Sequence, residues 1–144
     1  MDLRLYHNSH EFYYRSSFGA VPSGSRLILR LRAGGSDARN CRARIRLWQS
    51  NVGESFVPMT YQDGIFTGCV TMPPKGCLVW YYFIVDDGHE TVYYGNNYDR
   101  LGGEGAKYPD VPPAYQVTVY DKDAHTPDWF KHAIVYQIFP DRFR

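Results

Sequence analysis

The sequence predicts an all-β chain folded as an immunoglobulin-like antiparallel β-sandwich. Apolar and polar residues alternate over several short runs, turn residues recur about every 8–12 residues, and no run has the helical period. Aromatic residues make up 17% of the 144 residues, and 13 of them are tyrosines, which favour pleated, half-buried strands. We therefore expect about seven short strands in two packed layers.

The clearest alternation lies in residues 27–32 and 41–48. In the first run the leucines at 27, 29 and 31 share one face of a strand. The second run has one face for the core and one for solvent. Cys41, Ala43, Ile45 and Leu47 form the core face, and Arg42, Arg44, Arg46 and Trp48 form the solvent face. We expect the three arginines to be solvated or to contact an acidic region of a larger protein.

The middle of the chain predicts a hairpin followed by a central strand. Residues 56–61 and 65–72 flank Asp63-Gly64, and such a dipeptide between apolar runs favours a tight turn. After the break at residues 73–76, residues 77–85 are almost continuously apolar, which indicates a strand covered on both faces or at an interface. A turn at 86–89, a strand at 90–94 and a last strand at 115–120 complete the predicted sandwich.

Two segments do not follow this pattern. Residues 95–113 are rich in Gly, Asn and Pro, and a loop of this length within a compact domain is often functional. Residues 121–131 form a polar connection that is typical of a domain boundary. The apolar, β-branched run after it, residues 133–139, predicts a buried parallel strand that has no partner strand after it. We expect everything from about residue 121 onward to pack loosely or against a neighbouring molecule.

Composition excludes several classes of protein. The net charge of +1 comes from interspersed charges, so no basic field predicts nucleic-acid binding. The chain has no signal-peptide pattern and no apolar run of about 18 residues, so we expect no membrane association. Cys41, Cys69 and Cys77 form no metal-binding pattern and indicate reduced thiols in a cytoplasmic protein. One disulfide with a spare thiol would fit an extracellular protein.

Trp129 and residues 133–143 (AIVYQIFPDRF) closely resemble the start of the catalytic domain in glycoside hydrolase family 13. In that family, which includes α-amylases, neopullulanases and pullulanases, this run is the first strand of a (β/α)8 barrel. The preceding region resembles carbohydrate-binding module family 34, through residues 7–9, 14–15, 18–21, 27–31, 80–83 and 93–95. The resemblance implies a sandwich over 1–122, a linker over 123–132 and the beginning of a truncated barrel over 133–144.

The same resemblance implies that the parent protein hydrolyses O-glycosyl bonds of starch, glycogen or maltodextrins. Retaining glycosidases need two carboxylates about 5 Å apart. In this family those residues lie on later barrel strands, so we assign no catalytic residue here and expect the chain alone to be inactive. The full enzyme could bind calcium just after the barrel motif, but we expect no cofactor or metal in this chain.

If the sandwich binds glucan, exposed rings should contact the apolar faces of the sugar. Trp48, on the arginine face of its strand, is the first candidate, followed by Tyr61 beside the hairpin turn and Tyr94 at the start of the long loop. Trp80 and Tyr82 share one face of the central strand, opposite Tyr81 and Phe83. One of these pairs should be in the core, and Trp80 with Tyr82 are our candidates for an interface.

We expect no metal site among the polar residues. The five histidines have no metal-binding spacing, and surface or turn positions explain them. Asp86-Asp87, followed by Gly88, predicts a turn rather than a catalytic pair. Asn96, Asn97, Asp99 and Glu104 match no calcium loop.

Three functional hypotheses remain open at this stage. The sandwich either binds α-glucan directly or acts as a structural element that contacts the catalytic barrel and supports a homodimer, as interfaces are enriched in Tyr and Trp. The alternative from another class is a stand-alone immunoglobulin-like interaction domain with no enzyme attached. The sequence does not distinguish α-1,4 from α-1,6 linkages, nor hydrolysis from transglycosylation.

Overall fold

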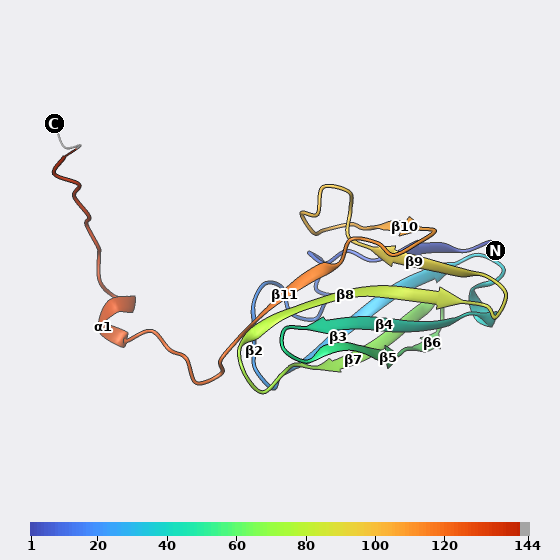
Figure 1. Cartoon of the computed structure of the whole chain (residues 1–144), viewed down its shortest axis with the longest axis horizontal. Helices are drawn as coiled ribbons and strands as arrows, with labels where there is room; N and C mark the ends of the chain where they lie inside the picture. The colour runs from blue at the N-terminus through green and yellow to red at the C-terminus, as the bar shows by residue number, and fades with distance from the viewer. Residues whose placement is uncertain (142–144) are drawn as a thin grey trace.

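A computed structural model describes residues 1–141, and within them the strands form two sheets packed face to face (Figure 1). The smaller sheet has the order β1 (Arg4–Tyr6), β3 (Arg26–Gly34), β7 (Ile65–Thr71) and β6 (Thr60–Gln62). The seven-stranded sheet contains β2 (Val21–Pro22), β4 (Arg42–Gln49), β5 (Gly53–Pro58), β8 (Cys77–Asp86), β9 (Thr91–Gly95), β10 (Ala106–Tyr108) and β11 (Tyr115–Tyr120). The predicted all-β, two-sheet arrangement is confirmed.

Strand β8 is the centre of the larger sheet. One of its edges pairs with β4 over nearly its whole length, and β4 in turn pairs with β5. The other edge is divided, because residues 77–81 pair with β11 and residues 83–86 pair with β9. Beyond these, β11 pairs with β2 in parallel and β9 pairs with β10. The central position predicted for the apolar run 77–85 is confirmed.

The core lies between the two sheets and follows the predicted alternation. Leu27, Leu29 and Leu31 are at most 1% exposed, and they face the inward side chains of β4 and β8. The inward residues of these two strands are Ala43, Ile45, Leu47, Val79, Tyr81, Phe83 and Val85, and Cys41 just before β4 joins them in the core. Since these side chains are removed from water on both sides, hydrophobic burial is the main stabilising contribution of this contact.

The hairpin turn forms as predicted, but the strand expected before it is divided. Asp63 and Gly64 have φ values of 49° and 83°, the left-handed pair that a two-residue turn needs. The run predicted as one strand over 56–61 belongs instead to β5, which pairs with β4, and to β6, which pairs with β7. Alternation cannot reveal this break, because the chain passes from one sheet to the other at Met59.

Two further differences concern the segments predicted as irregular. The loop expected over 95–113 contains β10, whose residues pair with 93–95 of β9. The first 25 residues, where no strand was predicted, contribute β1 and β2, of three and two residues. Such short edge strands carry too few residues to show a period.

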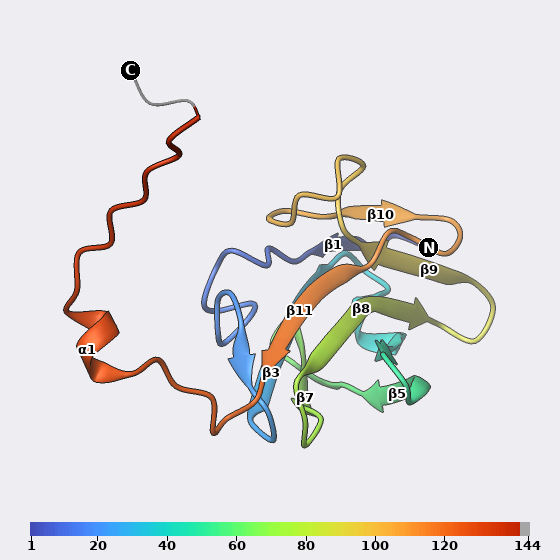
Figure 2. The same ribbon diagram turned by 60° about the vertical axis from the view of Figure 1, so that its left-hand side comes forward.

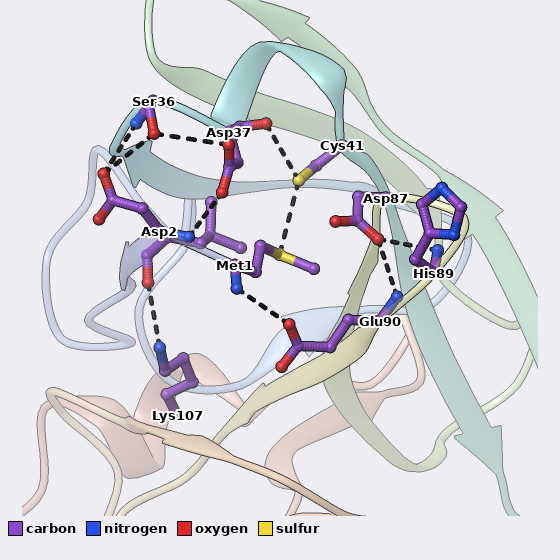
Figure 3. Close-up of polar contacts among 10 residues, drawn as sticks. Met1, Asp2, Ser36, Asp37, Cys41, Asp87, His89, Glu90 and Lys107 are labelled. Carbon is purple, nitrogen blue, oxygen red and sulfur yellow. Dashed lines mark hydrogen bonds and ion pairs between the residues drawn. The ribbon is translucent and has the colours of Figure 1, made fainter.

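Backbone groups near the start of β1 are held by side chains from neighbouring loops (Figure 3). The carboxylate of Asp37 accepts a hydrogen bond from the Asp2 amide at 2.6 Å, and Ser36 donates to Asp2. These bonds from Ser36 lower the pKa of Asp2 below its usual value. Lys107 donates to the carbonyl of Leu3 and so joins β10 to the same end of the sandwich.

After β11 the chain leaves the sandwich and extends away from it in both views (Figures 1 and 2). Between residues 121 and 141 it contains only α1 (Asp128–Lys131), and the side chains of these residues are exposed. The strand predicted at 133–139 does not form, because no other described segment lies beside it to pair with its backbone. Residues 142–144 of the predicted barrel segment lie outside the described residues. No helix in residues 1–141 is long and apolar enough to cross a membrane.

Candidate functional site

The outer face of the larger sheet carries a groove of about 580 Å³. Its floor includes Trp80 of β8 and the outward side chains Gln116 and Thr118 of β11. Arg15 and residues 18–20 line one side, and Asn96 and residues 100–102 line the other. The groove therefore combines segments from four separate parts of the chain, among them the long segment that was predicted to be functional.

Arg15 fixes the first wall against β11. Its side chain is buried, and its guanidinium donates to the carbonyls of Ser17 at 3.1 Å, Gly19 at 2.6 Å and Gln116 at 3.3 Å. Backbone carbonyls thus satisfy the buried arginine. The position of the wall is consequently tied to the strand that forms the floor.

The second wall is held by amide and hydroxyl side chains. Asn96 accepts from the amide of Gly102 at 3.0 Å, and Asn97 donates to the Gly102 carbonyl at 2.6 Å. The hydroxyl of Ser9 accepts from the Gly103 amide at 2.8 Å. Because these polar groups are occupied in holding the loop, the wall is preorganised, as a binding surface needs to be.

A buried histidine lies beneath the groove, contrary to the surface or turn positions expected for all five histidines. His7 is 0% exposed, and its ring nitrogens lie 2.7 Å from the Arg30 carbonyl oxygen and 3.0 Å from the Tyr81 hydroxyl. Burial lowers the pKa of His7 from 6.5 to about 4, so the ring is neutral at pH 7. Burial also raises the pKa of Tyr81 above its usual value.

The prediction that Tyr94 binds sugar is wrong, because the residue is buried. Its side chain is 2% exposed, and its hydroxyl donates to the His7 carbonyl and accepts from the Gly105 amide. A buried ring with a satisfied hydroxyl has no face left for a sugar. Tyr94 alternates into the core because its strand β9 continues to Gly95 before the loop begins.

Tyr61 lies away from the groove, on β6 of the smaller sheet. It is half-buried, and its ring centre is 4.9 Å from that of Phe66, a core residue. The structure therefore gives Tyr61 a packing contact at the edge of the core.

Trp48 and Trp80 are the candidate rings that remain on the outer face. Trp48 is 43% exposed, and the strand register places it directly opposite the half-buried Trp80. Tyr82, the other interface candidate, is 6% exposed beneath Arg46, whose guanidinium lies 5.2 Å from the ring centre. Of the predicted pair, Trp80 alone offers accessible surface, and it lies in the groove.

Sequence reasoning missed most of the residues that line the groove. Phe18 is 66% exposed at its rim, with its ring centre 5.4 Å from that of His10. Arg100, Gln116 and Thr118 supply hydrogen-bonding side chains. The alternation of residues 115–120 is a signal that could have placed Gln116 and Thr118 on the outer face, but only the folded chain shows that two loops lie beside them.

Aromatic and hydrogen-bonding side chains line the groove. Its lining contains a tryptophan, a phenylalanine, two arginines and a histidine, but no aspartate or glutamate. The lining therefore holds no carboxylate pair of the kind that glycoside hydrolysis uses. In residues 1–141 no three His, Cys, Asp or Glu side chains gather as metal ligands. Asp86-Asp87 forms the predicted turn, in which Asp87 accepts from the amides of residues 89 and 90.

Comparison with known proteins shows similarity to parts of three larger ones, each named amylopullulanase. The chain is 39% identical over 153 residues to the protein of Thermoanaerobacterium thermosulfurigenes and 39% identical over 149 residues to that of Thermoanaerobacterium saccharolyticum. It is 36% identical over 156 residues to that of Thermoanaerobacter thermohydrosulfuricus. These matches cover 96%, 96% and 99% of this chain but 8%, 11% and 10% of the relatives. The chain thus spans about a tenth of their length, and no protein-family model matches it.

Proposed function

We propose that this chain is an accessory, glucan-binding module of an enzyme that hydrolyses α-glucans. The observation that carries the proposal is the groove, in which Trp80 lies beside Gln116 and Thr118. A pyranose has apolar C–H faces and a rim of hydroxyls, so it needs a ring to pack on and polar side chains beside that ring. The name amylopullulanase, shared by the three relatives, supports an α-glucan as the ligand.

The segment after the sandwich supports a larger parent protein. Seven large apolar side chains between 129 and 139 are at least 47% exposed: Trp129, Phe130, Ile134, Val135, Tyr136, Ile138 and Phe139. An apolar surface of this size normally belongs to an interface. We infer that residues 133–144 begin a catalytic barrel that covers them and that supplies the hydrolytic carboxylates. The sequence that follows Arg144 in the gene tests this, because it should encode those residues.

Replacing Trp80 with alanine is expected to weaken the binding of maltoheptaose at least about tenfold. The substitution removes the ring on which the sugar packs and leaves the polar groups of the groove in place. Isothermal titration calorimetry on the whole chain measures the affinity, and tryptophan fluorescence provides a second signal.

Tyr13→Ala is the control, because Tyr13 is another accessible aromatic residue, 51% exposed, but lies over Arg30 of β3, in the other sheet. It should leave the affinity within about twofold of the original. Thermal unfolding of each variant separates lost binding from lost folding. If the unmodified chain gives neither heat nor a fluorescence change with maltoheptaose, the glucan-binding proposal is wrong, and contact with a barrel or a second subunit becomes the better explanation.

A further inference from the structure

The groove does not end at Trp80, because the strand register continues its floor across the sheet. Gln116 of β11 lies opposite Trp80, Trp80 lies opposite Trp48 of β4, and Trp48 lies opposite Glu54 of β5. Directly opposed residues on antiparallel strands point to the same face. We call Glu54, Trp48, Trp80 and Gln116 the tryptophan row. One end of this row is in the groove and the other is on the open sheet.

The open end of the row also combines exposed rings with hydrogen-bonding side chains, although here one of these is a carboxylate. Trp48 is 43% exposed, and the neighbouring Phe56 is 50% exposed. The carboxylate of Glu54 lies beside Trp48 in the register and accepts a hydrogen bond from Arg46 at 2.7 Å. An exposed ring bordered by charged, hydrogen-bonding side chains suits a sugar, since the ring takes the C–H face and the polar groups take the hydroxyls.

Arg46 holds this end of the row in place. Its guanidinium lies 5.6 Å from the Trp48 ring centre and 5.2 Å from that of Tyr82, and its side chain is 19% exposed. The second arginine of this strand, Arg44, lies 5.4 Å from the ring centre of Phe56. Because rings fixed by cation–π contacts lose little freedom when a ligand packs on them, the surface is prepared for binding.

The dimensions of the row set the length of the ligand. Neighbouring strands are about 4.8 Å apart, so the row crosses roughly 14 Å from β11 to β5. A single sugar ring covers only a part of this distance. A glucan that fills the groove and leaves it over Trp80 therefore meets Trp48 next.

We propose that the tryptophan row extends the groove into a site for long α-glucan chains, with Trp48 contacting only those sugar units that lie beyond the groove. This inference rests on the proposed function of the groove. Short oligosaccharides occupy the groove alone, whereas longer chains also contact Trp48 and Phe56. The module therefore favours long chains over short maltodextrins.

The test compares maltotriose with maltoheptaose by calorimetry on the whole chain and on Trp48→Ala. The unmodified chain should bind maltoheptaose at least about tenfold more tightly than maltotriose. Trp48→Ala should lower the affinity for maltoheptaose about tenfold and leave that for maltotriose within about twofold. Glu54→Gln, which weakens the bond to Arg46, should give a smaller loss that again affects maltoheptaose alone. Tyr13→Ala is the surface control, and thermal unfolding confirms that each variant is folded.

Each outcome separates this inference from the function on which it rests. If the unmodified chain binds neither sugar, the proposed function fails, and the extension fails with it. If it binds both sugars equally well and Trp48→Ala changes neither affinity, the groove binds glucan but the extension is wrong. If Trp48→Ala lowers the affinities for both sugars equally, Trp48 belongs to the groove itself, which also overturns the extension.

Discussion

Acidification from pH 6.5 to pH 4 is expected to lower the free energy of unfolding by about 3 kcal/mol through His7 alone. In the unfolded chain His7 takes up a proton near its ordinary pKa of 6.5, whereas in the folded chain burial holds its pKa at about 4. Between these values only the unfolded state is protonated, so the stability that the neutral ring provides is present above pH 6.5. It is lost progressively as the pH falls, and the loss through His7 is complete about one pH unit below its folded-state pKa.

Urea unfolding at a series of pH values measures this effect, and His7→Gln is the matched variant because glutamine does not titrate. The variant should lose most of the pH dependence between 6.5 and 4, whatever its stability at pH 7. The carboxylates of Asp2 and Asp87 have pKa values lowered by hydrogen bonds, so their contributions fade only below about pH 4. NMR titration of the His7 ring in the unmodified chain gives an independent value. A His7 pKa near 6.5 in the folded protein would contradict this prediction.

Much of the fold could be predicted because the alternation of apolar and polar residues along a strand indicates directly which face is buried. The four small apolar residues from Cys41 to Leu47 all became core, and the arginines between them all stayed on the outer face. The Asp63-Gly64 turn could be predicted for a similar reason, since its geometry depends on two residues. These features are local, and local physics determines them.

The candidate site depends on partners that are distant in the sequence, and for that reason only part of it could be predicted. The parity of β8 correctly placed Trp80 on the face opposite Tyr81. It could not show that Gln116, 36 positions later, would lie beside Trp80, nor that the loops at 15–20 and 96–102 would enclose it. His7 was misjudged for the same reason, because its partners Arg30 and Tyr81 come from two other strands.

Gly105→Ala is expected to destabilise the chain by about 3 kcal/mol and to weaken glucan binding with it. A methyl group on Gly105 would collide with the Gly95 carbonyl oxygen and the Tyr115 hydroxyl, and it would lie 2.7 Å from the Tyr94 ring. The amide of Gly105 also donates to the Tyr94 hydroxyl at 3.1 Å and to the His7 carbonyl at 3.2 Å. Neither the backbone nor the buried rings can move aside cheaply, so residues 102–105 must shift, and they continue the second wall of the groove.

Gly34→Ala is the matched control because it is the same substitution made where there is room. A methyl group on Gly34 meets nothing closer than the Arg4 side chain at 4.0 Å, so the cost should stay within about 0.5 kcal/mol. Urea unfolding of the two variants at pH 7 measures the difference, and calorimetry with maltoheptaose shows whether the wall has moved. Equal stability of the two variants would mean that Gly105 is not packed against Gly95 and Tyr115. A destabilised Gly105→Ala that still binds maltoheptaose with unchanged affinity would show that the wall at 96–102 holds its position without the contact at Gly105.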